Sequence, residues 1–301
     1  MADKKVSVCV VTYNQEKYIG QCLQSLADQV VDFEYEVLVS DDASSDQTPE
    51  IVQGFQERYP DIFKTYLHKQ NKGAGANYLF VHSKAVGDYI AHVDGDDYYY
   101  VDKLKVQADF LDKHPNCNIV WHKMRIELSD GRLKEYVQTN PENFKVGEYL
   151  YDMEFDRAAI LQFIAVGANS SKMYRRSVRE FDVADFETLD YFANVEQIGD
   201  GVGCYACDLP LGVYRAGVGL SSGSDKTRVL LYKTFMFFYK KYPEYRSCIN
   251  AAVLTYLISD LKNRRKTFWL FFKAYILTFH PASVVKLYRG MRIVRQLRFS
   301  K

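Results

Sequence analysis

The sequence lacks the features that mark disulfide-stapled and membrane-spanning proteins. Its six cysteines are scattered over 301 residues, unlike the dense cysteine framework of small secreted domains. Cys204 and Cys207 have the spacing of half a zinc knuckle, but no second pair exists, and the alternation around them suits a strand. The apolar run at residues 267–279 contains Lys273 and is shorter than the roughly 20 residues that span a bilayer. Since no cleavable signal pattern stands at the N-terminus, we expect a protein of the reducing cytosol.

The net charge is also small, +1, but the charges are unevenly distributed. Residues 261–301 carry eleven Lys or Arg and no acidic residue, whereas the first 260 residues carry 28 basic and 38 acidic side chains. Within this tail, residues 284–298 interleave apolar and basic side chains with the spacing of an amphipathic helix. Two interpretations stay open. The tail binds an anionic membrane surface, or its helices pack on the rest of the protein.

What the sequence does contain is a repeat of short apolar runs and helical segments. With 48% hydrophobic residues, the chain can bury the core of one large domain or two small ones. The predicted strands are residues 6–11, 35–40, 63–68 and 89–93. Between them, Asn14 is predicted to cap the first helix, and Thr48 and Pro49 are predicted to be the cap and the first residue of the second. This β-α-β-α-β-α-β order builds a parallel sheet with right-handed crossovers.

Polar clusters follow three of the four predicted strands. They are Thr12-Tyr13-Asn14, Asp41-Asp42 and Asp94-Gly95-Asp96-Asp97. The carboxyl ends of parallel strands meet at one edge of a sheet, and ligands bind there. The three clusters therefore predict one pocket for a nucleotide and a metal ion.

The third cluster places three carboxylates within four residues. Like charges packed against a strand end raise one another's pKa unless a cation or hydrogen-bond donors compensate. Mg²⁺ or Mn²⁺ suits carboxylate oxygens and takes one or two of them beside substrate phosphate oxygens. An EF-hand loop beginning at Asp94 is excluded, because Tyr99 and Lys105 stand where Gly and Glu are required. A solvated acidic turn is the plain alternative.

A glycine-containing segment, Asn-Lys-Gly-Ala-Gly-Ala-Asn, occupies residues 71–77. It lacks the third glycine of a dinucleotide-binding fingerprint, because position 78 is Tyr. The segment predicts only a tight turn into a helix whose N-terminal amides could face an anion.

These motifs, taken in order, resemble those of family 2 glycosyltransferases. The resemblance is carried by residues 10–16, 39–48, 71–77 and 94–97. It implies an α/β fold of the GT-A type, with a Rossmann-like, mostly parallel central sheet flanked by helices. The resemblance stops at residue 225, and the aromatic and aliphatic faces of residues 229–242 and 245–261 predict a helical C-terminal extension. The implied domains are a GT-A domain at 1–225, with a nucleotide-sugar-binding half at 1–100 and an acceptor-binding half at 101–225, and a helical, basic amphipathic region at 226–301.

The resemblance also assigns roles to single residues. Contacts with the nucleotide sugar are implied for Thr12, Tyr13, Asn14, Glu16, Asp41, Asp42, Lys72, Asn77, Asp94, Gly95 and Arg215. Asp94 and Asp96 match the DxD motif, which implies binding of Mn²⁺ or Mg²⁺, and Asp97 could substitute for one of them or lie behind them. The pair Ser170-Ser171, in a segment that resembles the strand lining the far side of the site, either contacts substrate or is structural.

Asp190 is the residue that the resemblance implies as general base. Inverting members of the family carry an Asp at the start of a helix, with a Tyr-Arg some two dozen residues later, here Tyr214-Arg215. The pattern departs in two places: Leu189 replaces the usual Glu or Gly, and Ala216 stands where relatives frequently have a His. The alternative for Asp190 is an acid favoured at a helix N-terminus by the macrodipole.

The sequence thus predicts a metal-dependent inverting glycosyltransferase, of the hexosyl or N-acetylhexosaminyl type. We expect it to move the sugar of a UDP-sugar to a hydroxyl of a glycan or lipid-linked acceptor, in the cytoplasm or on the inner membrane face through residues 261–301, with no nucleic-acid partner. A sugar nucleotidyltransferase is an alternative, although Thr12-Tyr13-Asn14 has none of the glycine expected in its first loop. A non-catalytic nucleotide- or carbohydrate-binding module is favoured only if Asp190 lies remote from the metal.

Overall fold

The computed structural model describes residues 4–128, 130–134, 153–164, 166–216 and 224–288. The chain forms two compact units. The first comprises Met1–Glu154, Gly167–Phe181 and Gly201–Gly219, and the second comprises Phe155–Val166, Asp182–Asp200 and Leu220–Lys301. This division differs from the domain boundary expected at residue 225, which stays a prediction.

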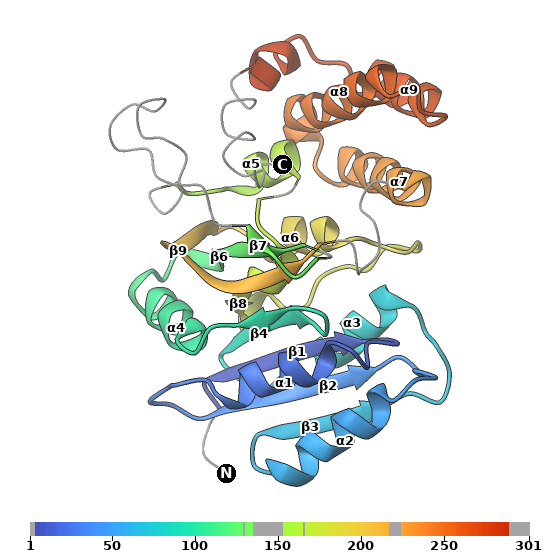
Figure 1. Cartoon of the computed structure of the whole chain (residues 1–301). Coiled ribbons are helices and arrows are strands. Elements are labelled where there is room, and N and C mark those ends of the chain that lie inside the picture. The colour runs from blue at the N-terminus through green and yellow to red at the C-terminus, as the bar shows by residue number, and fades with distance from the viewer. Residues whose placement is uncertain (1–3, 129, 135–152, 165, 217–223, 289–301) are drawn as a thin grey trace. The chain divides into compact units, whose positions relative to one another are not determined.

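The first unit is built on one sheet (Figure 1). Its described strands are β1 (Val6–Thr12), β2 (Tyr35–Asp41), β3 (Phe63–Leu67), β4 (Tyr89–Asp94), β5 (Tyr98–Tyr99), β6 (Cys117–Glu127), β7 (Leu133–Lys134), β8 (Met173–Arg175) and β9 (Val202–Arg215). The order is β3-β2-β1-β4-β8-β6-β9-β5, with β7 paired to β6. Strands β1 to β4 are mutually parallel, and β8 runs antiparallel to both β4 and β6. The predicted α/β fold around a mostly parallel sheet is confirmed.

Helices connect the parallel strands. They are α1 (Ile19–Ala27), α2 (Thr48–Arg58) and α3 (Ala74–Ser83), and α4 (Lys103–Lys113) follows β5. Two predicted helix starts are wrong by a few residues. Tyr18, not Asn14, occupies the N-cap of α1, and Thr48 is the first residue of α2 after Gln47. Asn14 cannot cap α1 because its side chain is hydrogen-bonded to the loop after β2.

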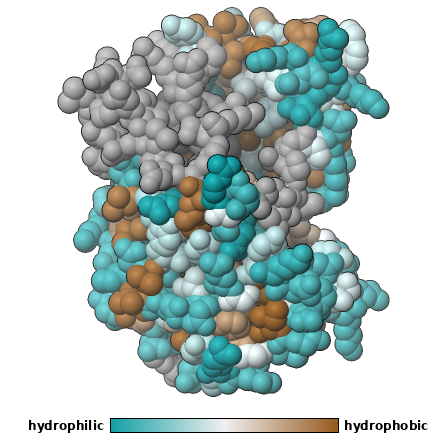
Figure 2. All heavy atoms as spheres, viewed as in Figure 1, coloured by the Kyte–Doolittle hydropathy of each residue, from teal (hydrophilic) through white to brown (hydrophobic). Residues whose placement is uncertain are grey.

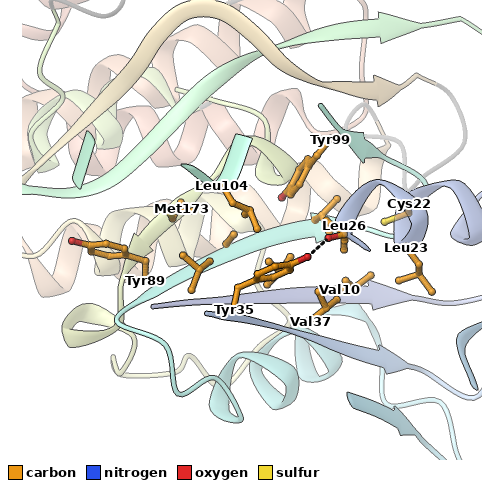
Figure 3. Close-up of a cluster of buried hydrophobic side chains, with 14 of the residues drawn as sticks. Val10, Cys22, Leu23, Leu26, Tyr35, Val37, Tyr89, Tyr99, Leu104 and Met173 are labelled. Atoms are coloured by element: carbon orange, nitrogen blue, oxygen red, sulfur yellow. Dashed lines mark hydrogen bonds between the residues drawn. The ribbon is translucent and has the colours of Figure 1, made fainter. Parts of the chain in front are cut away.

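The core of the first unit lies between α1 and the sheet. Ile19, Cys22, Leu23 and Leu26 are fully buried, as their helical spacing predicts. Figure 3 shows Leu26 beside Tyr35, whose hydroxyl donates to the Leu26 carbonyl at 2.9 Å. Burial of such aliphatic side chains stabilises the fold by about 1.5–3 kcal/mol each. This packing holds β1 and β2, and therefore the loops that follow them, in fixed register.

The second unit is mainly helical in its described residues. Its helices are α5 (Arg157–Phe163), α6 (Asp190–Gln197), α7 (Asp225–Lys241), α8 (Arg246–Lys262) and α9 (Phe268–Thr278). Arg228 of α7 forms a buried ion pair with Asp260 of α8, and Thr267 donates to the same carboxylate at 2.5 Å. The predicted helical C-terminal region is confirmed.

The basic amphipathic helix expected at 284–298 is only partly described. Residues 283–288 are helical, and the rest of that segment lies outside the described residues. No helix in the described part of the chain is long and apolar enough to cross a bilayer. All six cysteines are free thiols, and Cys204 and Cys207 lie in β9, as their alternation predicts.

Candidate active site

The carboxyl ends of β1, β2 and β4 meet at one edge of the sheet. Thr12 is in register with Asp41 of β2, and Val11 is in register with Asp94 of β4. The pairing continues past the strand ends, since the Asp42 backbone N–H donates to the Thr12 carbonyl at 3.0 Å. The predicted convergence of the three polar clusters is confirmed.

Asn14 and Glu16 tie together the loops that follow β1 and β2. Asn14 has a left-handed backbone with φ of 52°; its side-chain oxygen accepts from Ser45 N at 2.9 Å, and its own N–H donates to Ser44 Oγ at 2.8 Å. The Glu16 carboxylate accepts from Gln47 N at 3.0 Å. Both side chains therefore hold the two loops together by hydrogen bonds. Their direct contact with a nucleotide stays a prediction.

Asp41 and Asp42 are buried and hold loop backbone. Asp41 accepts from the Ser44 N–H at 2.9 Å and from the Ser44 hydroxyl. Asp42 accepts from the amides of Lys72 and Gly73 at 2.7 and 2.9 Å. The sequence predicted that the amides of the turn before α3 could face an anion, and the anion that they contact is the Asp42 carboxylate. The Lys72 side chain is exposed to solvent.

Asn77 fastens α3 to β2. Its Oδ1 accepts from Ser40 Oγ at 2.6 Å, and its Nδ2 donates to the Ser40 carbonyl at 3.0 Å. Both ends of the amide are engaged and the side chain is buried, so the role that the structure shows is structural. A contact between Asn77 and a nucleotide stays a prediction.

The turn after β4 brings its backbone close to the loop after β1. A Cβ at Gly95 would lie 2.4 Å from Gln15 Oε1 and 3.0 Å from Thr12 Cβ, so a larger residue would force the Gln15 side chain to move. The Asp94 side chain is 37% exposed, whereas Asp96 and Asp97 are buried. This close approach packs the acidic turn against the end of β1.

Arg215, at the end of β9, holds the acidic turn by hydrogen bonds. Its Nη1 donates to the Asp96 carbonyl at 2.6 Å, and its backbone N–H donates to Asp97 Oδ1 at 2.9 Å. Its Nε pairs with Glu127 at 3.1 Å, and its Nη2 donates to Gln21. All three guanidinium nitrogens thus donate hydrogen bonds within the protein, and Arg215 holds the acidic turn in place. Its contact with a nucleotide sugar stays a prediction.

The buried carboxylates of this turn repel one another. Burial, followed by the charge of Asp94, raises the pKa of Asp96 to about 6. Burial, followed by the charges of Asp94 and Asp96, raises the pKa of Asp97 well above its ordinary value. Three buried acceptors around the turn, Asp97 Oδ2, Thr12 Oγ1 and Gln15 Oε1, have no hydrogen-bond partner among the described residues. This surplus of acceptors and negative charge suits a bound cation.

The donor set fits a divalent ion that is completed by its substrate. No group of three or more His, Cys, Asp or Glu side chains in the described part of the chain could hold a metal ion. A magnesium-like ion at a nucleotide site, however, takes only one or two carboxylates and fills its other positions with phosphate oxygens and water. Asp94 and Asp96 would supply such a pair, which agrees with the implied DxD assignment and leaves it a prediction.

Asp190 lies in the second unit as the first residue of α6. Its Oδ1 accepts from the Tyr191 N–H at 2.9 Å, and the residue is exposed to solvent. Glu187, three residues earlier, forms an ion pair with Lys226 at 2.9 Å. The predicted helix start is confirmed, and the catalytic role of Asp190 stays a prediction.

Two residues that contact Asp94 were weakly signalled or missed in the sequence. Ser170, weighed above as substrate-contacting or structural, accepts from the Asp94 N–H at 3.0 Å. His92 Nε2 lies 3.1 Å from Asp94 Oδ1 and was not singled out. Its signal was its position two residues before Asp94, because residues i and i+2 of a strand point to the same face.

Comparison with known proteins places the chain in a family. The model of the family described as glycosyl transferase family 2 matches residues 7–181. An uncharacterised protein of Mycobacterium tuberculosis is 32% identical over 231 residues, which cover 74% of this chain and 63% of the relative. Poly(ribitol-phosphate) beta-N-acetylglucosaminyltransferase TarS of Staphylococcus aureus is 41% identical over 124 residues, 40% of this chain and 21% of the relative. The chain thus spans less than two thirds of the length of these relatives.

Solved structures show the same fold at lower identity. TarS residues 1–349 in complex with UDP-GlcNAc superpose with a TM-score of 0.60 and 23% identity, covering 82% of this chain and 71% of that chain. The mannosyltransferase PcManGT of Pyrobaculum calidifontis, in complex with GDP-Man and Mn²⁺, gives a TM-score of 0.54 at 16% identity, covering 97% and 84%. The fold is therefore of the GT-A type, and with a family match over more than half of its length the chain belongs to glycosyl transferase family 2.

Proposed function

We propose that the chain transfers a sugar from a nucleotide diphosphate sugar to a hydroxyl group of a glycan or lipid-linked acceptor. The observation that carries this proposal is the acidic turn Asp94–Asp97, held at the joined ends of β1, β2 and β4 with buried, unsatisfied acceptors around it. The complexes of TarS with UDP-GlcNAc and of PcManGT with GDP-Man support a nucleotide-sugar donor. Because TarS also matches in sequence, we favour a UDP-sugar.

The proposed reaction is one in-line displacement with inversion. The acceptor oxygen attacks the anomeric carbon as the bond from that carbon to the diphosphate breaks, and Asp190 accepts the acceptor's proton. A divalent ion bound at Asp94 and Asp96 would neutralise charge that develops on the departing diphosphate. The remaining contribution of the chain is positional: Arg215 and Ser170 hold the turn that presents these carboxylates.

Calorimetry of UDP binding with and without Mn²⁺ tests the donor site, and hydrolysis of a panel of nucleotide sugars then tests the activity. We expect metal-dependent UDP binding and slow release of UDP from one donor, with UDP-GlcNAc tested first. Formation of a nucleotide sugar from a sugar phosphate and a nucleoside triphosphate would instead establish a nucleotidyltransferase. Metal-dependent binding without turnover of any donor or acceptor would favour a non-catalytic module.

We further propose that the second unit binds an anionic membrane surface. Helix α9 buries Phe271, Ala274 and Thr278 and exposes an apolar stripe at spacings of three and four residues. The stripe consists of Trp269, Phe272, Ile276 and Phe279, which are 72, 41, 56 and 49% exposed. Figure 2 shows apolar residues at the top of the view, over the C-terminal helices. Exposed apolar area of this kind marks an interaction surface.

The charges beside this stripe favour anionic lipid as its partner. Exposed basic residues before and within α9 are Lys262, Arg264, Lys266 and Lys273. No acidic residue occurs between residues 261 and 288. Each basic side chain near an anionic surface contributes on the order of 1 kcal/mol, and apolar burial adds to this. A membrane surface would place the enzyme beside a lipid-linked acceptor.

Flotation with anionic vesicles tests this surface. Trp269→Glu removes an aromatic ring that would be buried in the membrane and adds a negative charge that anionic lipid repels. We therefore expect vesicle affinity to fall about tenfold or more. The matched control is Leu209→Glu, which adds the same charge at a residue of the first unit that is 68% exposed. Equal recovery of both variants and the wild type, or recovery that is the same with neutral vesicles, would contradict the membrane proposal in favour of helices that serve packing alone.

A further inference from the structure

A chain of hydrogen-bonded side chains runs from the interior of the first unit to Asp94. The Tyr174 hydroxyl of β8 lies 2.6 Å from Nδ1 of His82 in α3. Nε2 of His82 lies 3.0 Å from Nδ1 of His92 in β4, and Nε2 of His92 lies 3.1 Å from Asp94 Oδ1. Three separate elements of the fold thus contribute consecutive links. We call Tyr174, His82 and His92 the histidine relay.

The relay is buried everywhere except at the Asp94 end. Tyr174 and His92 are fully buried and His82 nearly so, whereas the Asp94 side chain is 37% exposed. The Tyr78 ring stacks on the His82 ring with centroids 3.8 Å apart. Burial of several polar rings is costly unless their hydrogen bonds are satisfied, and here each ring nitrogen of both histidines has a partner.

The direction of the hydrogen bonds follows from the chemistry of the last link. An ionised carboxylate only accepts hydrogen bonds, so His92 must donate from Nε2, which leaves its Nδ1 as acceptor when the ring is neutral. His82 must then donate from Nε2 and accept at Nδ1 from the Tyr174 hydroxyl. Burial lowers the pKa of His82 well below its ordinary value, so His82 is neutral. With both rings neutral, every donor in the relay points toward Asp94.

Asp94 is the carboxylate of the acidic turn that reaches solvent. Its side chain is 37% exposed, whereas Asp96 and Asp97 are buried. Its Oδ1 lies 3.1 Å from His92 Nε2, and its Oδ2 accepts from the Ser170 hydroxyl at 3.4 Å. The partly exposed carboxylate of the turn is therefore the one at the end of the relay.

We propose that Tyr174, His82 and His92 are positioning residues that hold the Asp94 carboxylate in the orientation required to bind a metal-complexed nucleoside diphosphate. A carboxylate is planar and rigid, so fixing Oδ1 against His92 also restricts where Oδ2 can lie. The proposal rests on the function proposed above, since it assumes that Asp94 contacts the diphosphate, its ribose or its metal. None of these three residues touches the ligand in this role.

Binding of UDP with Mn²⁺ to variants of the full chain tests the relay. His92→Leu removes the hydrogen bonds of the His92 ring to His82 and to Asp94. We expect UDP·Mn²⁺ affinity to fall at least about tenfold, as for a lost charge-assisted hydrogen bond. His92→Gln offers an amide N–H near the position of Nε2 and should recover part of that loss. His122→Leu is the matched control: His122 is also buried in the first unit, with Nδ1 bonded to the Lys123 carbonyl at 2.7 Å. It should lower the melting temperature while leaving UDP·Mn²⁺ affinity within about twofold of the wild type.

Nitrogen NMR of the ligand-free wild type separates the relay from the proposed function. We expect His82 to be neutral and His92 to carry a proton on Nε2, where it donates to Asp94, and Tyr174→Phe to change the Nδ1 shift of His82. If these signatures are found but the wild type does not bind UDP·Mn²⁺, the proposed function fails and the relay stands as a structural network. A His92 ring without a proton on Nε2 in the wild type, or His92→Leu binding as tightly as the wild type, would overturn the relay. If His92→Leu does not fold, Tyr174→Phe takes its place in the titration, with Tyr89→Phe, whose hydroxyl bonds Asp112 at 2.6 Å, as its control.

Discussion

Asp96→Ala is expected to abolish the Mn²⁺ dependence of UDP binding together with most of the affinity. Asp96 is 5% exposed, and burial, followed by the charge of Asp94, raises its pKa. A metal ion that bridges this turn and a diphosphate would lose one of its few protein ligands. We expect affinity measured with Mn²⁺ to fall about 100-fold or more, equivalent to roughly 2.8 kcal/mol, to the level that the wild type shows in chelator.

Asp88→Ala is the matched control for this titration. Asp88 immediately precedes β4, at the opposite end of the strand, and its side chain is 70% exposed. It removes the same charge without touching the acidic turn, so its UDP affinity should equal that of the wild type. Wild-type affinity and metal dependence in Asp96→Ala would show that the metal is held elsewhere.

The conservative variant Asp96→Asn adds a check on the folded state itself. A carboxyl whose pKa rises from 3.8 to about 6 on folding is favoured in its protonated form, so its ionisation destabilises the fold. The resulting loss in the free energy of unfolding is absent below about pH 4 and grows between about pH 4 and pH 6. Above that range it is on the order of 3 kcal/mol. Without metal, Asp96→Asn should therefore melt at a higher temperature than the wild type at pH 7.5, and the difference should vanish near pH 4. A lower melting temperature at both pH values would mean that Asp96 contributes a stabilising contact instead.

Asp190→Asn is expected to lower sugar transfer by about 10²–10⁴-fold while donor and metal affinity stay at wild-type values. A positioned carboxylate contributes roughly that factor by accepting the acceptor's proton in the transition state. Asparagine keeps the side-chain oxygen that accepts from the Tyr191 N–H, so the start of α6 should be preserved. Transfer rates and UDP·Mn²⁺ affinity measured on the same preparation separate a lost base from a lost donor site.

Glu187→Gln is the control that locates the base. Glu187 is the nearest other carboxylate in the sequence before Asp190, and it already pairs with Lys226 at 2.9 Å. We expect its transfer rate to change little. A large loss in Glu187→Gln with an unchanged rate in Asp190→Asn would move the base to Glu187, and a parallel loss of donor affinity in Asp190→Asn would assign that residue to the donor site.

The sequence by itself determined the parts of this protein that depend on local pattern. Apolar runs in β1, β2 and β4, and helical spacing in α1, predicted these elements within a few residues. Because the carboxyl ends of parallel strands share one edge, the sequence also predicted that Thr12, Asp41 and Asp94 would lie together. Backbone hydrogen bonding and side-chain periodicity carry this information over short distances along the chain.

Only the tertiary structure decided what individual polar side chains do. Asn77 and Asp42, expected at the nucleotide, bind Ser40 and the backbone of the turn before α3. Arg215 clamps the acidic turn across 119 residues of sequence, and the histidine relay joins α3, β4 and β8. Such contacts leave little local signal, because a buried polar group is satisfied by whichever donor or acceptor the fold brings within hydrogen-bond distance, and that partner can lie anywhere in the chain.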